Sequence, residues 1–252
     1  MALEPTGCRV NGNTYTGFLA GGSRAAPAPG VLVIHEGGGL TDHAKGRAAM
    51  SAELGYVAFA MDLFGPEVES PVPGRPETMA KAQAVVRALR EDVAELRARC
   101  AAALEVLQAH PQVDPARLAA IGFCFGGAAA IELARSGAPL AAVAGFHAGV
   151  LPGSAADDRA IAAKLLLCHG EGDPVVPVRQ IQDFTARLTA AGVDWQLHLY
   201  GGVGHSFANR EIDAWNLPGF RYDEAADRRS WAALMQLLGE VFEAQPQSSC
   251  RA

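Results

Sequence analysis

The sequence predicts an α/β protein with a mostly parallel sheet and helices on both faces of that sheet. Two observations lead to this prediction. Short apolar runs recur without the polar alternation of half-exposed strands, as expected where both faces of a strand are buried. They lie at residues 31–35, 56–62, 118–123, 140–147, 164–170 and 195–200. Segments with apolar residues at helical spacing fill the gaps between such runs, and this alternation is typical of parallel strands joined by right-handed crossovers.

The remaining elements follow in chain order. Residues 8–20 hold two strand-like runs around an Asn-Gly pair, which predicts a hairpin. Pro177 suits a helix start, and Gly55, Gly137 and Gly192 suit helix C-terminal caps. Residues 64–77 form the longest irregular segment, which is either a plain surface loop or a lid over the site. Two single apolar stripes of helical period complete the assignment: Leu89, Val93, Leu96, Cys100, Leu104 and Leu107, then Trp231, Leu234, Leu238 and Val241.

Length and composition exclude several classes of protein. The 252 residues are half hydrophobic, which suits one domain over residues 1–252 with a substantial core. A net charge of −6 gives no reason to expect nucleic acid as a partner. The first residues lack a signal-peptide pattern, and no apolar run approaches the roughly 20 residues that span a bilayer. Five widely spaced cysteines without a CxxC pair indicate neither a zinc site nor a disulfide framework. We therefore expect a cytoplasmic protein with mostly free thiols, no metal and no membrane partner.

The segment around Cys124 has the form of a nucleophile elbow. Gly122 and Gly126 flank the cysteine at two residues on either side, with a predicted strand before it and an alanine-rich helix after it. The chain must turn from strand to helix within one residue, so strained dihedrals are expected at Cys124 and glycine is needed at both flanking positions. A helix N-terminus also favours the thiolate form. The alternative is a buried structural cysteine that happens to have glycine neighbours.

Two further residues suit the partners of such a nucleophile. Asp173 follows the apolar run at 164–170, and His205 lies in the loop after the run at 195–200. In α/β-hydrolases the nucleophile is followed in sequence by an acid and then by a histidine, and ligands bind at the carboxyl ends of the strands. Cys124, Asp173 and His205 are therefore predicted to form a catalytic triad. Taken alone, Asp173 is also explained as a helix cap, and His205 as an ordinary loop histidine.

The segment after residue 35 suggests half of an oxyanion hole. Glu36 and three glycines follow a predicted strand, at the place where hydrolases supply one donor of this hole. The backbone N–H groups of Gly37 and Phe125 are predicted to converge on one oxygen. Structural roles are expected for four other histidines and for one cysteine, namely His35, His147, His169, His198 and Cys168.

Four segments in this order, HEGGGLTDH, GFCFGG, GEGDPVVP and GHSFAN, resemble the dienelactone hydrolase family, also called carboxymethylenebutenolidases. With the tail YDEAADRRSWAALMQLL the resemblance covers about residues 10–243. It implies a single α/β-hydrolase domain without cofactor. It also implies Cys124 as nucleophile, His205 as base and Asp173 as the residue that orients the base. Glu36 would lie beside the thiol and help to deprotonate it when substrate enters.

The chain departs from this family at one position. Dienelactone hydrolases have an arginine four residues after the histidine, which holds the substrate carboxylate, whereas this chain has Asn209. Lys81 or Arg75, near the place of a second family arginine, are candidate substitutes. Because asparagine cannot make a charged bidentate clamp, the expected substrate is a related small ester or lactone.

The expected chemistry is attack of the thiol on a lactone or ester carbonyl, followed by hydrolysis of an acyl-thioester. Activated esters and strained lactones suit a thiol nucleophile better than amides. Two alternatives stay open: a broad carboxylesterase or thioesterase without lactone preference, and a non-catalytic α/β-hydrolase-fold protein that binds a small ligand or a partner. The sequence leaves the oligomeric state open.

Overall fold

Among the residues that the structure describes, eight strands form one sheet, in the order β1-β2-β4-β3-β5-β6-β7-β8. The computed structural model describes residues 3–21, 26–66, 68, 71–73 and 75–243. The strands are β1 (Leu3–Val10), β2 (Asn13–Ala20), β3 (Ala28–Ile34), β4 (Val57–Met61), β5 (Val113–Phe123), β6 (Ala142–Phe146), β7 (Lys164–Gly170) and β8 (Trp195–Tyr200). The predicted hairpin is confirmed, since β1 pairs with β2 around Asn11 and Gly12, both at positive φ.

The sheet is mostly parallel, as predicted. The hairpin joins through β2, which runs antiparallel to β4, and from β4 to β8 every neighbouring pair is parallel. This arrangement, with helices on both faces, is the α/β-hydrolase architecture that the sequence predicts. The helices are α1 (Asp42–Glu53), α2 (Pro76–Glu91), α3 (Val93–Gln108), α4 (Phe125–Arg135), α5 (Ala155–Arg159), α6 (Val178–Ala191) and α7 (Glu224–Phe242), with a 3₁₀ helix η1 (Arg210–Trp215) before α7.

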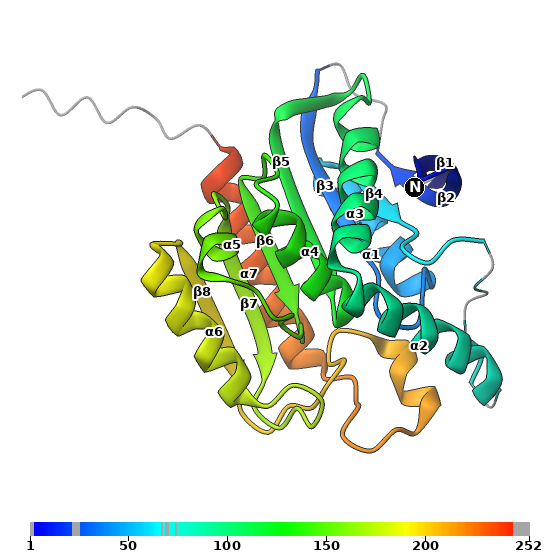
Figure 1. Cartoon of the computed structure of the whole chain (residues 1–252), viewed down its shortest axis with the longest axis vertical. Coiled ribbons are helices and arrows are strands. Elements are labelled where there is room, and N and C mark those ends of the chain that lie inside the picture. Colours follow the sequence, from blue (N-terminus) through cyan, green and yellow to red (C-terminus); the bar gives the residue numbers. More distant parts are fainter. Residues whose placement is uncertain (1–2, 22–25, 67, 69–70, 74, 244–252) are drawn as a thin grey trace, which may run out of the picture.

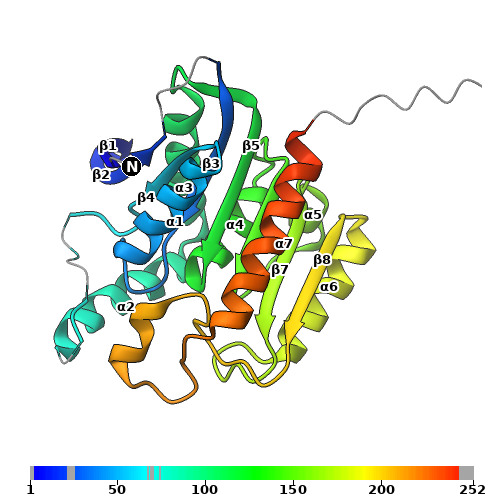
Figure 2. The same ribbon diagram turned by 180° about the vertical axis from the view of Figure 1, so that it is seen from behind.

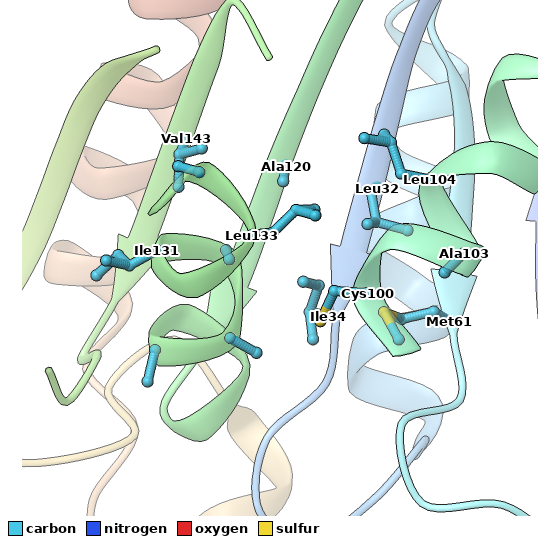
Figure 3. Packing of buried hydrophobic residues seen from close by; sticks show 14 of the residues in the cluster. Leu32, Ile34, Met61, Cys100, Ala103, Leu104, Ala120, Ile131, Leu133 and Val143 are labelled. Atoms are coloured by element: carbon cyan, nitrogen blue, oxygen red, sulfur yellow. The ribbon is translucent and has the colours of Figure 1, made fainter. Parts of the chain in front are cut away.

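Each face of the sheet has its own core. Helices α3, α4 and α6 cover one face (Figure 1), and α1 and α7 cover the other (Figure 2). Strand residues alternate between the two cores, as the pleat requires: Leu32 and Ile34 point to the α3 side, and Val31 and Val33 to the α1 side. Figure 3 shows Leu32 and Ile34 beside the side chains of α3.

One helix prediction needs correction. The stripe from Leu89 to Leu107 does not belong to a single helix, because α2 ends at Glu91 and α3 begins at Val93. Asp92 between them has φ −108° and ψ 79°, and its carboxylate accepts the Glu95 N–H at 2.9 Å. An N-cap aspartate followed three residues later by glutamate is a start signal for a new helix, and it interrupts the stripe.

The carboxyl ends of the parallel strands meet at one edge of the sheet. The segment between β8 and α7, orange in Figure 1, lies along this edge, and α2 reaches it from the side of the hairpin. Helix C-terminal glycines have positive φ as predicted, at Gly55, Gly137 and Gly192. In the part of the chain that the structure describes, no helix has the length and apolar character needed to cross a membrane.

Candidate active site

Cys124 occupies the turn between β5 and α4. Its φ of 51° and ψ of −115° lie outside the regions that a cysteine ordinarily adopts. A Cβ atom on Gly122 would lie 2.0 Å from the Gly126 carbonyl oxygen, and one on Gly126 would lie 2.3 Å from the Ile34 carbonyl oxygen. Glycine is therefore required at both positions. The Cys124 N–H donates to the Phe146 carbonyl at 2.9 Å, which fixes the turn against the end of β6.

A chain of two hydrogen bonds connects the thiol to a carboxylate. Cys124 Sγ lies 3.1 Å from His205 Nε2, and His205 Nδ1 lies 2.6 Å from Asp173 Oδ2. An ionised carboxylate only accepts hydrogen bonds, so the Nδ1–H group of His205 donates a hydrogen bond to Asp173 and Nε2 faces the sulfur. The other carboxylate oxygen, Oδ1, accepts the N–H groups of Val175 and Val176. Asp173 thus shapes its own loop and also orients His205.

Electrostatics favour an imidazolium at His205. Burial lowers the pKa of His205, but the neighbouring Cys124 sulfur and the Asp173 carboxylate outweigh burial and raise this pKa above its usual value. Burial raises the pKa of Asp173, and the hydrogen bond and charge of His205 reverse that effect and keep the pKa low. The site can therefore hold the His205 imidazolium beside the Asp173 carboxylate although both side chains are buried.

The loop of His205 is tied down on both sides. The His205 N–H donates to the Gly219 carbonyl at 2.9 Å, and the His205 carbonyl accepts the Arg221 N–H at 3.1 Å. The Phe220 ring packs edge-on against the imidazole, with ring centroids 4.8 Å apart. His205 is completely buried, so contacts with the protein and not with solvent set the orientation of its ring.

Glu36 lies at the end of β3 as predicted. Its Oε2 accepts a 2.7 Å hydrogen bond from Asn209 Nδ2. Burial raises the pKa of Glu36 to about 7, although the Asn209 hydrogen bond opposes this shift. The carboxyl group therefore changes its protonation state near neutral pH.

The two predicted oxyanion donors lie on segments that pack together. Phe125 is the first residue of α4, where backbone N–H groups have no acceptor within the helix. The next residue, Gly126, packs against the backbone of Ile34 and His35, directly before the segment of Gly37. The Val86 side chain of α2 lies near Gly37, at 3.6 Å from the position of an added Cβ.

The predicted substrate contacts have different surroundings. Asn209 is 5% exposed, and its Oδ1 accepts the Glu211 N–H at 2.9 Å while its Nδ2 donates to Glu36. Both polar groups of this amide are thus used within the protein. Lys81 is exposed on α2, and Arg75 is exposed just before that helix.

One histidine has a place that the sequence interpretation missed. His35 has the structural role expected of it, since its Nδ1 donates to the Glu36 carbonyl and its Nε2 accepts the Leu63 N–H. His147, for which the same role was expected, instead lies beside Glu36 and against the ring of His205. Its position at the carboxyl end of a strand, shared with Asp173, is the signal that could have found it.

Comparison with known proteins identifies the family. Residues 16–242 match the model of the dienelactone hydrolase family. A solved dienelactone hydrolase-like promiscuous phosphotriesterase from metagenomic libraries is 37% identical, with a TM-score of 0.88 over 96% of this chain and 98% of that chain. A Bradyrhizobium protein named "probable 2-oxo-3-(5-oxofuran-2-ylidene)propanoate lactonase" is 27% identical over 85% of this chain and 88% of its own. A "putative carboxymethylenebutenolidase" of Methylorubrum extorquens is 28% identical over 81% of this chain and 70% of its own. The chain therefore belongs to the dienelactone hydrolase family and is a hydrolase that acts on ester bonds.

Proposed function

We propose that this protein hydrolyses small lactones or activated carboxylic esters through a covalent thioester on Cys124. The observation that carries the proposal is the continuous chain from Cys124 Sγ to His205 Nε2 at 3.1 Å and from His205 Nδ1 to Asp173 Oδ2 at 2.6 Å. A nucleophile, a base and a group that orients the base are thereby within hydrogen-bond reach of one another, which is the requirement for nucleophilic catalysis.

In the acylation step, the thiolate of Cys124 attacks the carbonyl carbon and a C–S bond forms. The carbonyl electron pair moves to oxygen, and the backbone N–H groups of Gly37 and Phe125 donate to that oxyanion. When the tetrahedral intermediate collapses, the C–O bond to the leaving group breaks and the imidazolium of His205 gives its proton to the departing alkoxide. In a lactone this alkoxide stays attached to the acyl group.

In the deacylation step, neutral His205 accepts a proton from water as the water oxygen attacks the thioester carbon. The C–S bond then breaks, and the products are the acid and the free cysteine. Asp173 stabilises the imidazolium that forms in both steps. A thiolate leaves a tetrahedral intermediate more easily than an alkoxide does. An intermediate with a poor leaving group, such as the amine of an amide substrate, therefore expels the thiolate and returns to starting material.

Glu36 has a separate role in this proposal. Its pKa of about 7 suits a base that takes the thiol proton at neutral pH. The proton passes from Sγ to the Glu36 carboxylate and on to His205, which leaves a thiolate next to the imidazolium that acts in the acylation step. The free thiol has an ordinary pKa of about 8.5, so a base near it raises the fraction of nucleophile.

The acyl-thioester is the test of this function. Wild-type protein mixed with a p-nitrophenyl ester is quenched in acid, and intact mass is measured before and after hydroxylamine, which cleaves thioesters. We expect the mass of one acyl group, located on the Cys124 peptide and removed by hydroxylamine. Cys124→Ala should give neither the adduct nor turnover. Turnover by folded Cys124→Ala would reject a cysteine nucleophile and favour a different hydrolytic mechanism.

A panel of substrates decides between the alternatives. Equal turnover of lactones, aryl esters and acyl thioesters would favour a broad carboxylesterase or thioesterase, and no turnover of any would favour a binding protein. The 37% identity to a phosphotriesterase adds a second candidate reaction, attack of the same thiol on a phosphotriester with an aryl leaving group. A p-nitrophenyl phosphotriester in the panel tests this reaction with the same chromogenic product.

A further inference from the structure

His147 is held in an unusual position at the end of β6. Its φ of 40° lies in the left-handed region, which few non-glycine residues adopt. Its N–H donates to the Cys168 carbonyl at 2.8 Å, and its ring packs edge-on against His205 and Phe207 at centroid distances of 5.3 and 5.1 Å. The backbone strain thus turns this imidazole under the site and not toward solvent, and strain of this kind is concentrated at functional sites.

The polar atoms of His147 point to one partner. The residue is completely buried, and neither ring nitrogen makes a hydrogen bond to another described residue. Nε2 lies 3.6 Å from Glu36 Oε1, which is itself buried and without a hydrogen-bond partner among the described residues. The second oxygen of this carboxylate, Oε2, already accepts from Asn209. Buried polar atoms nearly always make hydrogen bonds. Two such atoms without a hydrogen bond, 3.6 Å apart, are therefore candidate partners for each other.

We propose that His147 is a positioning residue for Glu36, and that its Nε2–H donates to Glu36 Oε1 when the carboxylate is ionised. A movement of about half an ångström brings the two atoms to ordinary hydrogen-bond distance. Asn209 and His147 then hold one carboxylate oxygen each and fix the direction of the Glu36 side chain. This inference rests on the proposed function, in which Glu36 receives the thiol proton.

The surroundings keep His147 a neutral donor. Burial and the positive groups around it hold the pKa of His147 well below its usual value, so the ring carries one proton and not two. The groups that act on His147 are His205, His43, His169 and Arg47. Those that act on Glu36 besides Asn209 are His205, Arg47 and Glu211, and among them Glu211 opposes ionisation of the carboxyl. A substitution at His147 leaves all of these residues in the chain, but His205 is in ring contact with His147, so a variant that keeps a donor at this position is needed as a control.

The tautomer of His147 in the wild-type protein is the first test. Nitrogen-15 NMR of histidine-labelled full-length protein at pH 8 distinguishes an imidazole protonated on Nε2 from one protonated on Nδ1, with His147→Phe to assign the signal. We expect the Nε2–H form, which is the form that can donate to Glu36. The Nδ1–H form would overturn the proposal. The variant serves only for assignment, and the tautomer itself is read from wild-type protein in its native state.

The pKa of Glu36 is the second test. It is measured by carbon-13 NMR on glutamate-labelled protein, with Glu36→Gln to assign the signal. Loss of a donor to the ionised form should raise the pKa in His147→Phe by about one unit or more. His147→Gln places an amide N–H near the same point and should return the pKa to within about half a unit of wild type. Phe and Gln face the same backbone strain, so they form a matched pair.

These outcomes separate a contact from a general packing effect. An unchanged pKa in His147→Phe, or an equal rise in both variants, would overturn the proposal. Neither NMR measurement depends on turnover. If no acyl-thioester forms but both NMR results are as expected, the proposed function is rejected and the contact between His147 and Glu36 is retained. If both hold, the acid limb of kcat/KM should move to higher pH in His147→Phe by the same amount as the Glu36 pKa.

Discussion

Asn209 connects the loop of His205 to Glu36. Its Nδ2 donates to Glu36 Oε2 at 2.7 Å, and its Oδ1 accepts the Glu211 N–H at 2.9 Å. Since each polar group of the amide already has a partner within the protein, the neutral side chain is held in place at the position where the family resemblance leads us to expect an arginine. Of the charged groups that act on Glu36, the Glu211 carboxylate opposes an anion there, whereas His205 and Arg47 favour it.

This arrangement predicts that a carboxylate on the substrate does not raise kcat/KM of the wild-type protein. Matched neutral and anionic lactones of the same shape should give similar kcat/KM. Asn209→Arg should raise kcat/KM for the anionic lactone relative to the neutral one by roughly 10- to 150-fold, the effect of one charged hydrogen bond. Added salt should reduce that gain.

The control for this prediction uses the other candidate cations. Lys81→Gln and Arg75→Gln remove positive charge from exposed positions in and before α2, and should leave the ratio of anionic to neutral kcat/KM unchanged. A strong preference of wild type for the anionic lactone that disappears in Lys81→Gln or Arg75→Gln would mean that the carboxylate clamp lies on α2. Dienelactone-like substrates would then be favoured again.

The cysteines should differ sharply in reactivity. Cys124 is partly exposed, whereas Cys8, Cys100 and Cys168 are buried. Burial raises the pKa of the Cys100 and Cys168 thiols to about 12, which leaves little thiolate at neutral pH. Among these four, iodoacetamide should label Cys124 first, as followed by peptide mapping over time. Labelling of another of these cysteines at the same rate would contradict the arrangement.

The raised pKa of Glu36 makes stability depend on pH in a defined direction. Its pKa of about 7 lies above the ordinary value of 4.5, so between these values the folded state holds more protons than the unfolded state. The free energy of unfolding therefore falls as pH rises through this window. Below pH 4.5 the group is protonated in both states and the cost is absent; above pH 7 the cost is complete.

Glu36→Gln removes this cost because the amide stays neutral and its oxygen still accepts from Asn209. The variant should gain stability over wild type as pH rises from 4 to 8, by up to about 3 kcal/mol. Urea unfolding of both proteins at several pH values gives the difference, and Glu53→Gln at an exposed position controls for the substitution itself. A difference that stays constant with pH would contradict the raised pKa of Glu36.

The positions of the strands and the nucleophile elbow could be predicted because each depends on local sequence. Continuous apolar runs indicate strands buried on both faces, and glycines on either side of Cys124 indicate a turn that no Cβ would tolerate. The contact between Glu36 and Asn209 joins residues 173 positions apart, and no local pattern encodes it. The place of His147 beside Glu36 could not be predicted for a related reason, because the sequence indicates that His147 follows a strand but not which side chains it faces.

The tight approach of α4 to β3 gives the last prediction. A methyl group on Gly126 would lie 2.3 Å from the Ile34 carbonyl oxygen and 2.4 Å from that of His35, so Gly126→Ala must push the helix and the strand end apart. We expect a loss of stability of about 1–3 kcal/mol, as for other overpacked cores. Because Cys124 and Phe125 move with the helix, kcat/KM should also fall by about 10²-fold, the effect of misplacing reacting groups by an ångström. Gly46→Ala in α1 is the matched control, since a methyl group there meets nothing within 4 Å and should leave kcat/KM unchanged while stabilising the helix. Thermal unfolding and ester hydrolysis of the two variants decide the point. A Gly126→Ala protein with wild-type stability and activity would show that the elbow and the end of β3 are not packed as described.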